Sequence, residues 1–387
     1  MSVLNALYIS RRPAAAFVVV GVFWGCFAAH VPELKAQLMA SDALFGTLLL
    51  GSATGLVSSM WLAPRADRFL GARSMQFGVV ALSLAWLLPS QISAPLVFAM
   101  AIALVGLCSG LLDVVMNARV SELEAAHARP LMNANHAMFS VAYAIAAVVV
   151  SFTREAGVPP PYVFAGFSIF CLLLAPFLRT DIVDVTAEDG YQGRYPLWPI
   201  ALCGAITFVA FMSEATVEAW SALHVERTLG GGAAEGALGP AMLGLTMAIG
   251  RFSGQAVLEK MREVPVVIVA SVISAVGAVL AAIATTPGWA YLGFGVLGLG
   301  VSVIGPTGLA LVGKLVAPHL RTEAISRVAV IGFSGFFFAP VLMGLMSEAF
   351  GLRVAYGAVA GLLLMTVPLA ITVARQPLVP VDRRQQT

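Results

Sequence analysis

Charged residues are scarce in this sequence. Asp, Glu, Lys and Arg make up 11% of its 387 residues, while 59% are hydrophobic. Soluble proteins carry about 25% charged and about 45–50% apolar residues, so this chain has too few polar side chains to cover a water-exposed surface. This shortage excludes a soluble enzyme and a disordered chain. The net charge of +2, with no basic stripe, also argues against nucleic-acid binding.

Cysteine is also rare, and its spacing matches no familiar site. The four cysteines lie singly inside apolar runs, with no C-x-x-C pair, and are Cys26, Cys108, Cys171 and Cys203. Neither a zinc site nor a disulfide framework is indicated, so we expect no metal and no cofactor. The patterns G-x-x-x-x-G-K-[ST], G-x-S-x-G and H-E-x-x-H are missing as well, which argues against ATP as the energy source and against an enzyme.

Long hydrophobic runs dominate the chain instead. A helix needs about 20 apolar residues to cross a bilayer, and twelve stretches come close to that length. They are about 13–32, 44–63, 75–90, 94–117, 133–153, 160–178, 197–223, 236–257, 264–283, 288–312, 324–347 and 354–374. The first follows two arginines, as the apolar part of a signal peptide would, but the eleven stretches after it favour a membrane span.

Basic residues are distributed unevenly between the two ends of these stretches. If the N-terminus is cytoplasmic, eighteen of the 22 Lys and Arg residues fall on the cytoplasmic side. The four on the outer side are Lys35, Arg154, Arg227 and Arg353. Because cytoplasmic loops are enriched in Lys and Arg, we expect a multi-pass protein of the inner membrane with both termini in the cytoplasm.

The twelve stretches divide into two related sets of six. The polar, acidic segment 179–196 separates them, and an offset of about 184–191 residues relates the halves, so that His30 corresponds to Glu214. Two repeats joined by a cytoplasmic linker are typical of transporters. We therefore predict an all-α membrane protein with twelve transmembrane helices in two pseudo-symmetric six-helix bundles, formed by residues 1–178 and 197–387.

The loop after the second stretch supports this layout. Residues 63–73 read A-P-R-A-D-R-F-L-G-A-R and resemble the G-x-x-x-D-R-x-G-R-R signature of the major facilitator superfamily. Alanine replaces the first glycine, and one extra residue precedes the second. The resemblance covers nearly the whole chain and implies a conformational latch at the cytoplasmic end. Its candidate residues are Asp67, Arg68, Arg73 and Arg119. A plain positive-inside loop would explain the arginines but would not explain the aspartate.

Four further segments resemble a narrower group. Residues 30–35, 106–117, 136–140 and 214–221 are similar to the YbjJ/MosC-like inner-membrane proteins, although Ala219 stands where that group usually has an aspartate before the tryptophan. The substrates of the group are poorly defined, and one branch is associated with rhizopine-type, sugar-like compounds. The resemblance therefore implies a slight preference for polar, sugar-like cargo.

Polar residues at membrane depth are the candidates for function, because a charge there costs at least about 2.5–3.5 kcal/mol. Asp113 and Asn117 share one face of the fourth stretch, and His136 lies about one turn inside the fifth. Asp113 could anchor a helix junction beside Arg119, or it could couple transport to protons. His136 could form hydrogen bonds at a gate, or it could carry a proton.

Glu214 and Glu218 form a second candidate site, one turn apart on the seventh stretch. Two carboxylates this close repel each other when both are ionised, so they favour sharing a proton. We expect Glu214 to face His30 across the outer pathway and to be the main coupling residue. In the alternative, Glu218 lies in the wet outer interface. Trp24 and Trp220 could stack on a substrate ring, although such residues also serve as core or lipid-facing side chains.

These patterns together predict a monomeric secondary active transporter. We expect it to move a small organic solute across the membrane by alternating access, with protons as the coupling ion. A drug or metabolite exporter of the same fold, or a membrane sensor that does not transport, remains an alternative.

Overall fold

Residues 3–180, 197–258, 261–316 and 320–376 are described by the computed structural model of this chain. Within these ranges the regular secondary structure is entirely helical. Most of the predicted linker 179–196 lies outside the described residues, so the exact limits of the two bundles remain a prediction.

The twelve apolar stretches each fall on a helix. The first half of the chain contains α1 (Val3–Ile9), α2 (Arg11–Gln37), α3 (Asp42–Leu48), α4 (Leu50–Leu70), η1 (Gly71–Arg73), α5 (Ser74–Ala85), η2 (Pro89–Gln91), α6 (Pro95–His127), α7 (Met132–Glu155), α8 (Pro160–Leu174) and η3 (Ala175–Leu178). The second half contains α9 (Leu197–Leu223), η4 (His224–Thr228), α10 (Ala233–Leu258), α11 (Glu263–Ile283), α12 (Pro287–Leu315), α13 (Arg321–Phe350) and α14 (Leu352–Ala374).

Helices long and apolar enough to cross a membrane occur in nine segments of the described chain, and two of these segments, 42–91 and 323–374, each contain more than one helix. These segments account for eleven of the predicted spans. The eighth stretch lies on α10, which is not one of the nine segments, so the arrangement is consistent with twelve spans but the exact count stays a prediction. The helices persist through internal prolines at Pro32, Pro64 and Pro306, which membrane helices tolerate because neighbouring groups satisfy the freed carbonyls.

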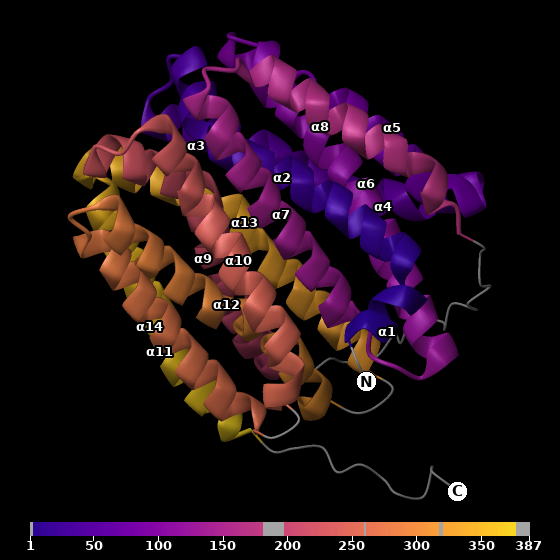
Figure 1. The fold of residues 1–387 in the computed structure, drawn as a ribbon. Coiled ribbons are helices and arrows are strands. Elements are labelled where there is room, and N and C mark those ends of the chain that lie inside the picture. The colour runs from indigo at the N-terminus through magenta and orange to yellow at the C-terminus, as the bar shows by residue number, and fades with distance from the viewer. Residues whose placement is uncertain (1–2, 181–196, 259–260, 317–319, 377–387) are drawn as a thin grey trace, which may run out of the picture.

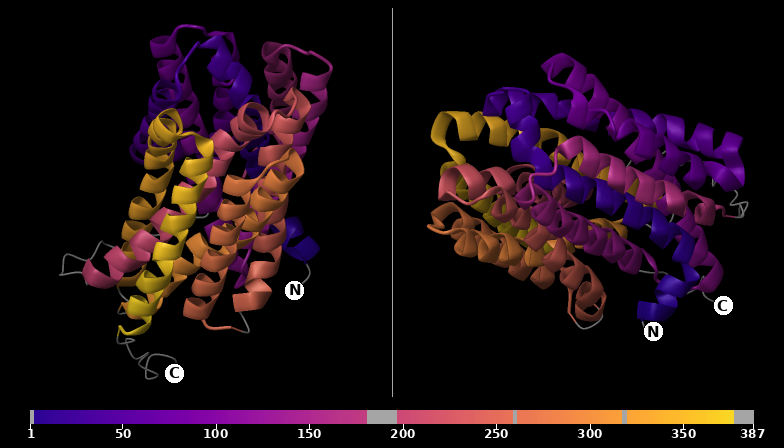
Figure 2. Two further views of the ribbon diagram at one scale, coloured as in Figure 1. Left: turned by 90° about the vertical axis from the view of Figure 1, so that its left-hand side faces the viewer. Right: turned by 45° about the horizontal axis from the view of Figure 1, so that its top comes forward.

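The helices form two bundles that lie side by side (Figure 1). Helices α2 and α4–α8 lie on one side, and α9–α14 lie on the other. We call the end at which α2 begins and α14 ends the inner end, and the opposite end the outer end. Short α1 lies at the inner end, as the further views also show (Figure 2). The inner end is the one that we predict to face the cytoplasm.

The two bundles approach most closely where glycine leaves room. A Cβ atom on Gly244 of α10 would lie 2.7 Å from Tyr143 Cδ1 of α7, and one on Gly344 of α13 would lie 2.5 Å from the Asp42 carbonyl oxygen of α3. Both approaches are closer than a Cβ atom allows, so glycine is required there. The α3–α13 contact closes the bundles against each other at the outer end.

Candidate functional site

A cavity of about 220 Å³ lies between the two bundles. Helices α2, α4, α6 and α7 of the first bundle and α9 and α13 of the second line it. This volume is just below the range of about 300–1,000 Å³ typical of small-molecule sites. The cavity therefore has room for a small organic solute, and its wall comes from both halves of the chain.

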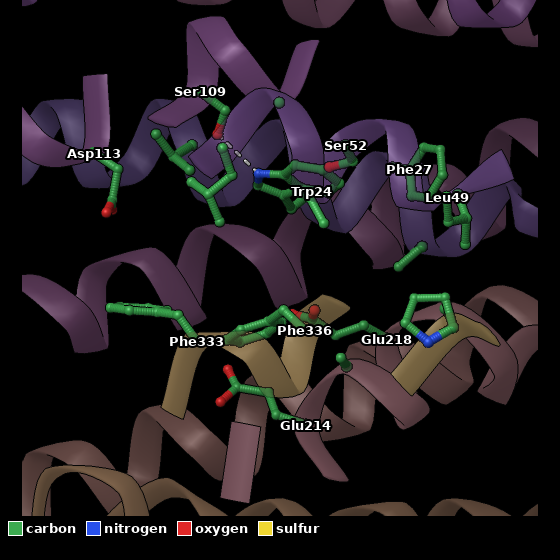
Figure 3. Close-up of a pocket in the computed structure, with 18 of the residues that line it drawn as sticks. Trp24, Phe27, Leu49, Ser52, Ser109, Asp113, Glu214, Glu218, Phe333 and Phe336 are labelled. Atoms are coloured by element: carbon green, nitrogen blue, oxygen red, sulfur yellow. Dashed lines mark hydrogen bonds between the residues drawn. The ribbon is translucent and has the colours of Figure 1, made fainter. Parts of the chain in front are cut away.

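Three carboxylates reach this cavity from opposite sides (Figure 3). Asp113 lies on α6 in the first bundle, whereas Glu214 and Glu218 lie on α9 in the second. The Asn117 side-chain amide donates to Asp113 Oδ1 at 3.2 Å and to the Asp113 carbonyl oxygen at 2.8 Å. Asp113 and Asn117 thus interact along their own helix, as their spacing of four residues allows.

Glu214 is paired with an arginine of the neighbouring helix. Arg251 on α10 donates to Glu214 Oε1 at 3.1 Å. Its other terminal nitrogen donates to Ser140 Oγ at 2.5 Å and to the His136 carbonyl oxygen at 3.4 Å, both on α7 of the first bundle. The basic-residue count assigned Arg251 to the cytoplasmic side, but its guanidinium joins the two bundles and compensates the Glu214 charge.

Glu218, one turn further along α9, has a different environment. Among the residues that the structure describes, it makes neither a hydrogen bond nor an ion pair, although it lines the cavity together with Asp113 and Glu214. The two glutamates predicted from the sequence therefore lie together as expected. Their environments differ, because among the described residues Glu214 forms an ion pair with Arg251 and Glu218 forms none.

His136 does not present its ring to this cavity. Its imidazole packs edge-on against Phe17 of α2, with ring centroids 4.8 Å apart, and its backbone carbonyl accepts the Arg251 hydrogen bond. Trp24 does line the cavity, and its indole nitrogen donates to Ser109 Oγ at 3.1 Å.

His30 and Trp220 lie away from the cavity. His30 is fully buried, and its Nδ1 lies 2.9 Å from the Cys26 carbonyl oxygen. It does not face Glu214, so the expected pair across the outer pathway is not observed. The ring of Trp220 is fully buried and packs edge-on against Phe45 of α3. Both rings thus pack against aromatic rings of neighbouring helices, His30 against Phe164 and Trp220 against Phe45.

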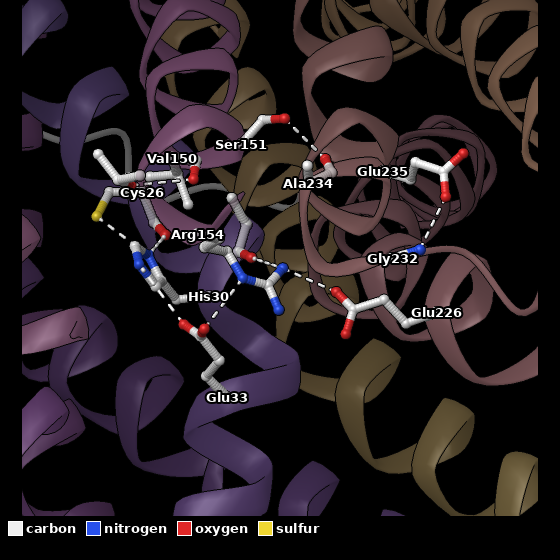
Figure 4. Close-up of polar contacts among 12 residues, drawn as sticks. Cys26, His30, Glu33, Val150, Ser151, Arg154, Glu226, Gly232, Ala234 and Glu235 are labelled. Carbon is white, nitrogen blue, oxygen red and sulfur yellow. Dashed lines mark hydrogen bonds and ion pairs between the residues drawn. The ribbon is translucent and has the colours of Figure 1, made fainter. Parts of the chain in front are cut away.

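The outer end contains ion pairs that the sequence reasoning missed (Figure 4). Arg154 at the end of α7 lies 3.3 Å from Glu33 Oε1 of α2. It also donates to Glu226 Oε1 at 2.7 Å and to the Ala29 carbonyl oxygen at 2.9 Å. Glu226 belongs to η4 of the second bundle, so this arginine holds the two bundles together.

A second set of ion pairs lies beside the first. Arg227 of η4 makes a two-pronged contact with Asp42 of α3, at 2.7 and 2.6 Å, and also donates to Ser347 of α13. Lys35 lies 3.0 Å from the same aspartate. We call the four residues whose ion pairs join the bundles here the outer clasp: Asp42, Arg154, Glu226 and Arg227. Three of the four basic residues assigned to the outer side, Lys35, Arg154 and Arg227, form these pairs. Basic residues are uncommon on that side of a membrane protein, so their position was the signal in the sequence that could have revealed these ion pairs.

The predicted latch residues lie at the inner end, within one bundle. Arg119 of α6 donates to both carboxylate oxygens of Asp67 on α4, at 2.7 and 3.0 Å, and to Glu122 at 2.6 Å. Arg68 donates to the Pro64 carbonyl oxygen, and Arg73 is exposed at the end of η1. The Asp67–Arg119 pair therefore fastens α4 to α6.

Comparisons with known proteins agree with this architecture. The family model described as Major Facilitator Superfamily matches residues 202–386. An uncharacterized MFS-type transporter of Yersinia pestis is 27% identical over 366 residues, covering 93% of this chain and 94% of the relative. The membrane protein MosC of Rhizobium meliloti is 26% identical over 349 residues, covering 87% of this chain and 83% of the relative.

The fold is also found among solved structures. A D-xylose-proton symporter aligns with a TM-score of 0.75 at 15% identity, covering 98% of each chain. This chain is thus a multi-pass membrane protein whose residues 202–386 match the Major Facilitator Superfamily model and which resembles MFS-type transporters over most of its length.

Proposed function

We propose that this protein moves a small organic solute across the inner membrane by alternating access, with protons as the coupling ion. One observation carries the proposal: a cavity lined by both bundles holds carboxylates, and ion pairs between the bundles close it at the outer end. In this state the cargo would reach the cavity from the inner end. The same proposal includes a first bundle that ends at residue 178, a second bundle that begins at residue 197, cytoplasmic termini and a monomeric state.

The outer clasp supports alternating access because it must open for cargo to pass. Arg154–Glu226 and Arg227–Asp42 both connect the first bundle to the second. Opening the outer end breaks them, and cargo or proton binding must compensate for that cost through a difference in affinity between the two states.

Proton coupling is best assigned to Glu218. The Arg251 guanidinium already compensates Glu214, whereas Glu218 lines the cavity without a hydrogen bond or ion pair among the described residues. A carboxylate in a closing cavity is less costly once a proton neutralises it. This changes the expectation from the sequence, in which Glu214 was the main coupling residue.

Transport into proteoliposomes tests the proposal, after a thermal-shift screen has identified a solute that stabilises the folded protein. A pH gradient should drive accumulation of that solute by the unmodified protein. Glu218→Gln should abolish accumulation, because the driven step needs a side chain that can gain and lose the proton. Glu155→Gln, at an exposed position on α7, is the matched control and should behave as wild type. Normal accumulation by Glu218→Gln contradicts the assignment, and binding without any movement identifies a sensor.

A further inference from the structure

The charges around the central cavity do not balance. Asp113, Glu214 and Glu218 all line it, and within the part of the chain that the structure describes one cation, Arg251, forms an ion pair with one of them, Glu214. Both terminal nitrogens of that arginine are engaged, one by Glu214 and the other by Ser140. The guanidinium is therefore occupied by protein partners and is poorly placed to bind an anionic cargo, while two carboxylates retain the capacity to bind a cation.

The same walls are rich in aromatic rings. They are Trp24, Phe27, Phe139, Phe333 and Phe336. Phe211 stacks on Phe333 and Phe336, with centroids 5.1 and 5.3 Å away, which orients those two rings. Figure 3 shows both of them between the side that carries Asp113 and the side that carries Glu214. Aromatic faces attract organic cations within about 6 Å, and tryptophan does so most strongly.

Neutral polar groups are few at this surface. Apart from the three carboxylates and the Trp24 indole, the polar side chains among the described lining residues are Ser52 and Ser109, and Ser109 already accepts a hydrogen bond from Trp24. A neutral sugar would leave many of its hydroxyl groups without partners, which is costly in a closed cavity. In the described residues, no three His, Cys, Asp or Glu side chains are arranged to hold a metal ion. The lining thus suits an organic cation better than a sugar or a metal.

We propose that the cargo carries a protonated amine, which the carboxylate of Glu218 binds while the aromatic rings contact the rest of the molecule. This inference rests on the proposed function, because it assigns a cargo class to the same cavity. It narrows the predicted polar cargo to solutes that bear an amino group.

Binding measured with matched probes tests this proposal. The probes are amines and their hydroxyl counterparts: cyclohexylamine with cyclohexanol, benzylamine with benzyl alcohol, and glucosamine with glucose. Their affinity for the full-length protein in detergent is read at neutral pH from the rise in melting temperature. At least one amine should bind at least about tenfold more tightly than its counterpart, because bonds to charged groups are the stronger ones. A panel in which no amine does so contradicts the proposal.

Variants locate the effect in the cavity. Glu218→Gln should reduce the amine preference to less than about threefold. Glu218→Asp keeps the charge and should retain the amine preference. This variant also serves as the control that the protein still folds with a different polar side chain at this position. Glu155→Gln should keep the full preference, because its carboxylate is exposed at the end of α7. An unchanged preference in Glu218→Gln overturns the assignment.

Failure of this inference can be separated from failure of the proposed function. An amine that binds through Glu218 but does not cross the proteoliposome membrane supports the cargo class and contradicts transport. A neutral solute that is transported while no amine binds preferentially supports transport and contradicts the cargo class.

Discussion

At the scale of single residues, the two glutamates of α9 differ because of one partner. Arg251 contacts Glu214 but does not form an ion pair with Glu218, although the two acids are one helical turn apart. The sequence shows that both acids share a helix face, since that follows from the spacing of four residues. It does not show which of them meets an arginine 37 residues away, because that depends on the rotation of α10 against α9.

We expect the Arg251–Glu214 pair to stabilise the folded protein. Arg251→Gln leaves Glu214, which is 6% exposed, without its cation, and removing one partner of a buried pair typically costs about 3–5 kcal/mol. The variant should therefore show a clear decrease in apparent melting temperature in detergent. The double variant Arg251→Gln/Glu214→Gln should recover much of that loss, and a double variant no more stable than Arg251→Gln alone would contradict this account.

The Asp67–Arg119 pair permits a similar comparison. Arg119 forms ion pairs with both Asp67 and Glu122. Asp67→Asn removes the first of these pairs and leaves Arg119 paired with Glu122. Arg119→Gln should therefore decrease the melting temperature more than Asp67→Asn does, since it leaves two carboxylates unpaired and a lost charged hydrogen bond costs about 1–3 kcal/mol. Equal decreases in both variants would contradict this reading of the inner end.

At the scale of elements, the short π-helix η4 organises the outer clasp. It places the adjacent residues Glu226 and Arg227 against two different parts of the first bundle, α7 and α3. Turns of π-helix often occur at functional sites, and this one directs two side chains of opposite charge to separate partners. The apolar pattern of α9 does not predict this π-helix. The pattern indicates which residues cross the membrane, but it does not determine how the helix ends.

Loss of one clasp contact should move the outer end toward an open state. Arg227→Gln removes the two-pronged contact with Asp42. Spin labels on cysteines introduced at the exposed positions Leu44 of α3 and Ala349 of α13 should then report a longer distance. The four native cysteines are buried, which favours labelling of the introduced ones. An unchanged distance distribution in Arg227→Gln would exclude the clasp as a gate.

At the scale of the whole molecule, the sequence predicted the fold because the signals that define it are local. The twelve apolar stretches fall on helices α2 to α14, since span length depends on consecutive residues alone. The candidate site, in contrast, depends on contacts between the two bundles, which local sequence patterns do not predict. His30 was placed opposite Glu214 by repeat position, but it lies against Cys26 and Phe164 within its own bundle.

The orientation of the molecule gives a further prediction. Reporter fusions at Glu188 and after the last residue should both report the cytoplasm, because eighteen of 22 basic residues lie at that side in the predicted topology. A fusion at Gly230, between η4 and α10, should report the opposite side. A periplasmic signal from either of the first two fusions would overturn the assignment of inner and outer ends.

Reversible closure of the outer end tests alternating access most directly. Ala43 of α3 and Glu348 of α13 are in contact there, since the Ala43 amide donates to the Glu348 carboxylate at 2.8 Å. Cysteines at these two positions can be joined by a short, reducible cross-linker, and each single-cysteine variant serves as a control. We predict that solute movement into proteoliposomes stops when the linker joins the bundles and recovers when it is reduced. Movement at an unchanged rate through the linked protein would contradict the account.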